Sequence, residues 1–141
     1  MTQRGRRIAF DYGDVRRGVA LCDPDGILSS PLSVLDSKSR DFLDQISALI
    51  AEHEPIRIFV GLPMNMSGSK GESAERTESF AQSLQSITDL PIVFVDERLS
   101  TVSAQKKLKE AGVSMRDSKS VIDAMAAVAI LEQGLLRENL A

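Results

Sequence analysis

The chain has 141 residues, 43% apolar and 26% charged, so it has the length of one domain and the composition of a soluble folded protein rather than a disordered one. Its net charge of −3 argues against a strongly basic protein that binds nucleic acid regardless of sequence. An aromatic content of 4% without Trp argues against base stacking as the main mode of such binding. With one Cys and one His, neither an intrachain disulfide nor a zinc cluster of these residues is possible.

Three apolar runs open the chain and predict an antiparallel meander. They cover residues 7–12, 18–22 and 27–35. The sequence Asp23-Pro24-Asp25-Gly26 separates the second run from the third and is typical of a tight turn, because Pro and Gly stand where such a connection needs them.

The rest of the chain predicts helices that alternate with strands. The predicted helices cover residues 40–54, 73–87, 100–112 and a last segment from Ser118 or Ser120 to about 138, and the predicted strands cover residues 56–62 and 91–97. The last strand is apolar on both faces, as a buried parallel strand is. Short alternating connections favour parallel pairing through right-handed crossovers. We therefore expect an α/β fold with a mixed five-stranded sheet, a three-stranded antiparallel meander followed by two parallel strands, flanked by helices.

Asp11 is a carboxylate at the end of the apolar run Ile8-Ala9-Phe10. A buried charge at the end of such an apolar strand has a high free energy unless a counterion or hydrogen-bond donors stabilise it. The candidates are a bound cation, a neighbouring Arg16 or Arg17, and backbone donors in the turn at Gly13. These alternatives have different consequences for function, because only the first points directly to metal-assisted chemistry.

Further acidic residues follow the last predicted strand, at Asp96 and Glu97, and lie within the last predicted helix, at Asp123. The first two could form a surface pair with Arg98, and Asp123 could complete a capping box with Ser120. Because ligands gather outside the carboxyl ends of parallel strands, these acids and Asp11 could instead converge on a divalent cation. Metal-assisted hydrolysis of a phosphodiester is the chemistry that such a site favours.

Other catalytic classes have little support in the sequence. His53, between Glu52 and Glu54 at a predicted helix end, is the one His that a Ser-His-Asp hydrolase could use, and no Gly-x-Ser-x-Gly elbow is present. The stretch Gly68-Ser69-Lys70-Gly71 lacks the spacing of a phosphate-binding Walker loop. Covalent catalysis is therefore disfavoured.

Four motifs in order resemble the YqgF/RuvX family, and together they cover most of the chain. They are Phe10-Asp11-Tyr12-Gly13 with Arg16-Arg17-Gly18-Val19-Ala20, Val60-Gly61-Leu62-Pro63-Met64-Asn65 with Gly68, Val95-Asp96-Glu97-Arg98-Leu99-Ser100-Thr101 with Ala104, and Ile122-Asp123 leading into Ala126-Ala127 and Ile130-Leu131. The family is similar to RuvC-type resolvases and has an RNase H-like fold. It is described as Holliday junction resolvase-like and as the nuclease that matures the 5′ end of pre-16S rRNA.

The resemblance implies a single RNase H-like domain over residues 1–141 and a role for particular residues. Carried over by motif, the metal-binding and catalytic acids are Asp11, Glu97 and Asp123, with Asp96 as the alternative to Glu97 because the two lie on opposite faces of a strand. The substrate-binding residues are Arg16 and Arg98, with weaker candidates at Lys70, Asn65, Lys106 and Lys107. In the general RNase H arrangement the strand beside the first ends in a carboxylate, whereas here the neighbour ends in residues 61–65, which leaves the number of metal ions open.

The resemblance therefore implies a nuclease that requires Mg²⁺ or Mn²⁺ and matures pre-16S rRNA, with a Holliday junction resolvase and a non-catalytic RNA-binding assembly factor as alternatives. A nucleotide-binding fragment of the sugar-kinase and actin type is the rival enzyme, although its two-lobed closure needs a longer chain. The expected partner is nucleic acid, either structured RNA or branched DNA, bound by a monomer or a homodimer. The longest apolar run, residues 124–131, is far below the ~20 residues that span a bilayer, so we expect a cytoplasmic protein without a membrane partner.

Overall fold

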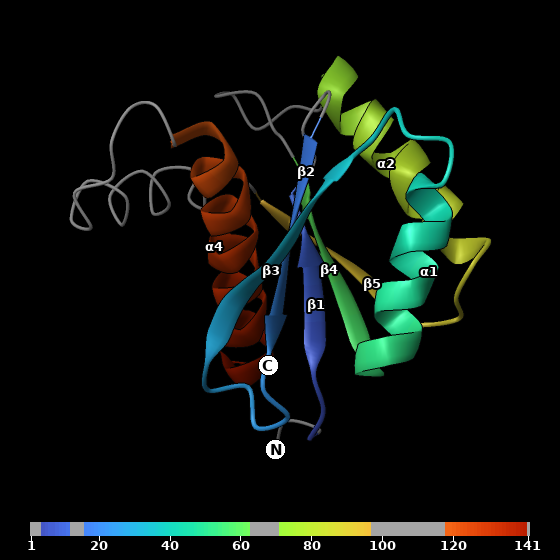
Figure 1. The fold of residues 1–141 in the computed structure, drawn as a ribbon. Coiled ribbons are helices and arrows are strands. Elements are labelled where there is room, and N and C mark those ends of the chain that lie inside the picture. Colours follow the sequence, from blue (N-terminus) through green and yellow to red (C-terminus); the bar gives the residue numbers. More distant parts are fainter. Residues whose placement is uncertain (1–3, 12–15, 63–70, 97–117, 141) are drawn as a thin grey trace.

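A five-stranded sheet lies between helices on its two faces (Figure 1). The computed structural model describes residues 4–11, 16–62, 71–96 and 118–140. The strands are β1 (Arg7–Phe10), β2 (Arg16–Cys22), β3 (Ser29–Asp36), β4 (Arg57–Leu62) and β5 (Ile92–Asp96), and the helices are α1 (Phe42–His53), α2 (Glu72–Gln85) and α4 (Ser118–Leu140). The predicted helix over residues 100–112 lies outside the described residues.

The sheet has the order β3-β2-β1-β4-β5 and mixed pairing. Strands β1, β2 and β3 pair antiparallel, while β4 pairs parallel with both β1 and β5. This arrangement confirms the predicted fold class of an antiparallel meander followed by two parallel strands. It also confirms that the strand ending in residues 61–62 lies beside the first strand, with β5 one position further out.

The central strand β1 separates two hydrophobic cores. Ile8 and Phe10 pack with the core under α1 and α2, whereas Ala9 packs with the core under α4, and all three are fully buried. Small residues allow α4 to approach the sheet closely. At Gly134 an added Cβ would lie 2.7 Å from the ring of Phe59 on β4, so this helix position has no room for a side chain.

A buried ion-pair cluster holds the C-terminal end of α4. Arg7, only 1% exposed, places Nη2 2.9 Å from Oε2 of Glu138 and donates from Nη1 to the carbonyl of Gly5 at 2.6 Å. Arg57 pairs with the other carboxylate oxygen of Glu138. Because Arg7 and Arg57 begin β1 and β4, this cluster anchors the last turns of α4 at the edge where these strands begin. The first turns of α4 therefore lie toward the edge where the strands end (Figure 1).

Strand β3 begins two residues later than predicted because the preceding turn is longer. The carboxylate of Asp23 accepts hydrogen bonds from the N–H groups of Ile27 and Leu28, at 2.7 and 3.0 Å. These hydrogen bonds lower the pKa of Asp23. They hold Ile27 and Leu28 in the turn, where Ile27 is 83% exposed.

The prediction that the last strand is buried on both faces is wrong. Strand β5 is the edge of the sheet, and Val93 on it is 37% exposed. Helix α4 crosses mainly β2 and β3, at the other side of the sheet, and so leaves this part of β5 less covered. None of the helices in the described ranges is both long enough and apolar enough to cross a membrane.

Candidate functional site

Asp11 lies directly after β1 and is 7% exposed. Its backbone N–H donates to the carbonyl of Gly18 at 3.0 Å, which continues the pairing of β1 with β2 one residue beyond the strand. Since side chains alternate along a strand and Ala9 packs against α4, the carboxylate of Asp11 belongs to the α4 face of the sheet. A carboxylate this deeply buried is stabilised only by hydrogen-bond donors or a positive charge.

The positions level with Asp11 on the neighbouring strands carry no acid. The register of β1 with β4 pairs Phe10 with Val60 and so puts Gly61 beside Asp11, and Gly61 in turn pairs with Val95 on β5. Gly61 is buried and has no side chain to cover Asp11 from that side. An acid from β5 must therefore come from beyond Val95.

Asp96 follows Val95 but belongs to the opposite face. Phe94 packs against the core under α1 and α2, and Val95 packs against the core under α4. Alternation then assigns Asp96 to the α1 and α2 side of the sheet, away from Asp11. By this alternation the two carboxylates are expected on opposite faces of the sheet. Glu97, the other candidate, lies outside the described residues.

Asp123 occupies a position in the second turn of α4, which begins at Ser118. Ser120 therefore lies inside the helix, and it is not the N-cap residue that the capping-box explanation of Asp123 requires. Asp123 precedes Ala127 by four residues and Ile130 by seven, which is the spacing of one helix face. Ala127 and Ile130 both pack against the sheet. The side chain of Asp123 itself lies outside the described part.

The remaining predicted site residues fall on undescribed parts of the chain. Arg16 is the first residue of β2, but its side chain is not among those described. The predicted residues Arg98, Lys70, Asn65, Lys106 and Lys107 lie outside the described ranges altogether. Within those ranges, no group of three or more His, Cys, Asp or Glu side chains gathers as a metal site would require, and of the three predicted ligands only the side chain of Asp11 is described.

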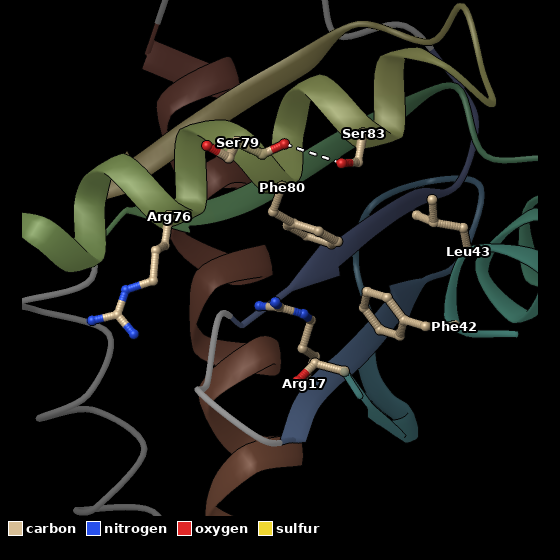
Figure 2. A pocket seen from close by; sticks show the side chains of 8 residues that line it. Arg17, Phe42, Leu43, Arg76, Ser79, Phe80 and Ser83 are labelled. Atoms are coloured by element: carbon tan, nitrogen blue, oxygen red, sulfur yellow. Dashed lines mark hydrogen bonds between the residues drawn. The ribbon is translucent and has the colours of Figure 1, made fainter. Parts of the chain in front are cut away.

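Arg17 does not share a face with Asp11. It is 7% exposed, and its guanidinium lies 4.5 Å from the ring centre of Phe80 and 5.2 Å from that of Phe42, both on the α1 and α2 side (Figure 2). The described contacts of Arg17 thus lie with these rings, on the face opposite the one to which strand alternation assigns Asp11. The sequence reasoning missed this separate environment, although an Arg two residues before the core residue Val19 on an alternating strand was a signal for it.

A family model and individual relatives both match nearly the whole of this chain. The family model described as "RuvX: Holliday junction resolvase" matches residues 5–137. A Streptomyces coelicolor protein is 43% identical over 139 residues, covering 97% of this chain and 83% of the relative. A Rhodococcus opacus protein is 46% identical over 142 residues, covering 96% and 79%. Both relatives are named as candidate pre-16S rRNA nucleases.

Among solved structures, RuvC from Thermus thermophilus in complex with a Holliday junction substrate superposes with a TM-score of 0.59 at 11% identity, covering 96% of both chains. A second structure of Thermus thermophilus RuvC gives a TM-score of 0.58 at 12% identity, covering 95% of this chain and 96% of that one. At this identity the likeness concerns the fold, which is RNase H-like as in RuvC.

Proposed function

Because the chain belongs to the RuvX family, we propose that it is a metal-dependent nuclease that cleaves phosphodiester bonds in the 5′ maturation of pre-16S rRNA. The observation that carries this proposal is the buried carboxylate of Asp11 at the carboxyl end of β1, on the sheet face covered by α4. Ligand sites of open α/β sheets form at this edge. The names of relatives at 43% and 46% identity favour precursor rRNA as the substrate.

The acids that complete the proposed site are Glu97 and Asp123. Asp96 is assigned to the other face of the sheet, which leaves Glu97 as the acid of this run that a continued strand would direct toward α4. Asp123 shares helical spacing with Ala127 and Ile130, which pack against the sheet, and its position lies near the end of α4 that is directed toward the same edge. Support for the set is thus the alternation of β5 and the helical spacing of α4, together with the four family motifs.

These residues fit a divalent cation that prefers oxygen ligands, Mg²⁺ or Mn²⁺. A buried carboxylate beside a residue without a side chain, Gly61, offers oxygen ligands and leaves that side of Asp11 uncovered. When bound, such an ion activates water and stabilises the leaving oxygen of a phosphodiester. In this proposal Arg16 and Arg98 bind substrate phosphates through their permanently charged guanidinium groups, with Lys70 and Asn65 as further contacts.

A second candidate function is the resolution of Holliday junctions. The description of the family model and the RuvC-like fold favour it. Symmetric cutting of a four-way junction requires two active sites, hence a homodimer, whereas trimming an RNA end requires only one. We rank it second because the relatives with much higher sequence identity carry the name of an rRNA nuclease.

The decisive experiment compares two substrates under the same conditions. The wild-type protein is incubated with a precursor 16S rRNA fragment and with a four-way DNA junction, in Mg²⁺, in Mn²⁺ and after chelation by EDTA. We expect cleavage of the RNA, its loss in EDTA and its recovery on adding either ion. Preferential cutting of the junction would favour the resolvase, and RNA binding without cleavage under any of these conditions would favour an assembly factor.

A matched pair of substitutions tests which acid of the β5 run takes part. Glu97→Gln is expected to lower kcat for the precursor rRNA at least a hundredfold, roughly the upper range found when supporting groups of a metal site are lost. Asp96→Asn, one residue away but assigned to the opposite face, is expected to retain kcat within about threefold of wild type, since residues outside the site have small effects. For both variants kcat is measured by steady-state cleavage at saturating RNA. The opposite ranking of the two variants would contradict the assignment of Glu97.

A further inference from the structure

A pocket with a mixed polar and apolar lining lies on the sheet face opposite the one assigned to Asp11, between the start of β2 and the helices α1 and α2 (Figure 2). Its volume is about 320 Å³, within the range of pockets that hold small ligands or parts of larger ones. Its charged lining residues among those described are Arg17 and Arg76, and hydroxyl groups come from residues such as Ser37 and Ser79. No acidic residue is found among the described residues that line it.

Arg17 gives this pocket a fixed positive charge. The guanidinium cannot be deprotonated in a protein, and the residue Arg17 is 93% buried. The rings of Phe80 and Phe42 hold it by cation–π contacts at 4.5 and 5.2 Å, and Phe80 is itself held edge-on by Phe10 at 5.8 Å between ring centres. The guanidinium is therefore preorganised, so binding a ligand costs it little further conformational entropy.

The surroundings of Arg17 favour an anion. Arg76 is exposed one turn before Phe80 on α2, it lines the same pocket as Arg17, and in Figure 2 its side chain points down from α2 to the left of Arg17. Two guanidinium groups in a partly dehydrated pocket repel a cation and attract an anion more strongly than they would in water. Phosphate matches them because its oxygens accept two parallel hydrogen bonds from one guanidinium and further bonds from hydroxyl groups.

The pocket also lies near the proposed active site along the sheet edge. Arg17 precedes Gly18, whose carbonyl accepts the N–H of Asp11, so both sites belong to the edge where β1 ends, on its two faces. Packed layers lie about 10 Å apart, and one strand of nucleic acid advances about 3.4 Å per nucleotide. A segment of roughly six nucleotides is therefore long enough to pass from one face to the other.

We propose that the pocket formed by Arg17 and Arg76 binds a backbone phosphate of the nucleic-acid strand while the strand is cleaved on the opposite face of the sheet. This inference rests on the proposed function, because it takes nucleic acid as the polyanion that the chain binds. It adds a substrate subsite outside the acidic cluster. The pocket holds the strand and takes no part in the chemical step.

The test measures the affinity for a single-stranded RNA of roughly a dozen nucleotides, long enough to fill a site of this size. An Asp11→Asn background prevents cleavage during the measurement. Adding Arg17→Met is expected to raise the Kd about tenfold and to reduce the slope of log K against log salt by about 0.7, the value for one phosphate contact with a single strand. Arg76→Gln is expected to raise the Kd about threefold, because an exposed charge is screened by water and salt.

The matched control is Arg4→Met, which removes the same charge from an exposed residue at the opposite edge of the sheet, next to Asp25. We expect its Kd to stay within about twofold of the parent protein, since charges beyond a Debye length of roughly 10 Å are largely screened. Thermal unfolding of Arg17→Met should match the parent, because an apolar side chain of similar size suits the space between two Phe rings. Should this variant unfold, Arg76→Gln still tests the pocket.

Equal affinity and equal salt dependence for Arg17→Met and Arg4→Met would overturn the proposal. A second result would also overturn it. In that result Arg17→Met weakens the binding of inorganic phosphate or a mononucleotide but leaves the affinity for the RNA strand unchanged. These outcomes are distinguishable from failure of the proposed nuclease function. The nuclease function is tested by the cleavage rate, which should fall in the single variant Asp11→Asn. The pocket is tested by the affinity for RNA.

Discussion

Asp11→Asn is expected to lower kcat for cleavage of the precursor rRNA by at least about a thousandfold, which corresponds to roughly 4 kcal/mol of transition-state stabilisation. The physical reason is the loss of negative charge at a buried position where the side chain keeps nearly the same shape. A neutral amide binds Mg²⁺ or Mn²⁺ more weakly than a carboxylate does. The measurement is steady-state cleavage of a labelled RNA fragment at saturating RNA and at one fixed metal-ion concentration that is the same for both proteins.

The control for this variant is Asp25→Asn, which removes an exposed carboxylate at the opposite edge of the sheet. We expect it to cleave at the wild-type rate. A second readout is independent of activity: adding Mn²⁺ should raise the Tm of the wild-type protein and of Asp25→Asn, because a ligand that binds only the folded state stabilises it, and should raise it less in Asp11→Asn. Wild-type cleavage by a folded Asp11→Asn protein would refute the proposed role of this residue.

Glu138→Ala is expected to lower the free energy of unfolding by about 3–5 kcal/mol. Glu138 is the carboxylate that pairs with Arg7, a guanidinium only 1% exposed, and with Arg57. Its removal leaves a buried positive charge without its counterion and releases the last turns of α4 from the sheet. The measurement is equilibrium unfolding in urea, with the m-value compared to confirm that both states remain the same.

Two comparisons test whether the burial of the ion pair between Glu138 and Arg7 is the cause of the lost stability. Arg4→Ala breaks the exposed pair between Arg4 and Asp25, whose side chains are 75% and 55% exposed, and should cost no more than about 1 kcal/mol. The double variant Arg7→Met/Glu138→Leu replaces the buried pair by apolar groups and should recover most of the stability lost in Glu138→Ala. A cost for Glu138→Ala as small as that for Arg4→Ala would mean that this cluster does not anchor α4.

The arrangement of the strands illustrates what hydrophobic patterning can predict. Alternation and turn residues were sufficient for the meander of β1, β2 and β3, and β4 and β5 follow within one or two residues of the expected bounds. Patterning was insufficient at Ile27 and Leu28. There the side chain of Asp23 binds their N–H groups and prolongs the turn, which is a competition between side chain and sheet that apolar residue types do not report.

In the candidate site, too, some residues could be identified from the sequence and others only from the packing. The residues at the ends of the predicted elements, Asp11 above all, were recognisable because a charge next to a dry strand is costly and because the four motifs follow in family order. That reasoning left Asp96 and Glu97 as alternatives, and it treated Arg17 as one of several partners for Asp11. The assignment of Asp96 and Arg17 to the opposite face came only from the packing of Phe94, Phe80 and Phe42 against one core.

Local structure and family membership were thus present in the order of the residues, because periodicity, turn chemistry and motif spacing are properties of short segments. Strand order, the exposed edge at β5 and the face occupied by each charged residue depended on contacts between segments far apart in the chain. The burial of Arg7 beneath α4 is the clearest case, since its partner Glu138 lies 131 residues later. A pairing across that separation carries no local pattern, and only the packing of α4 on the sheet decides it.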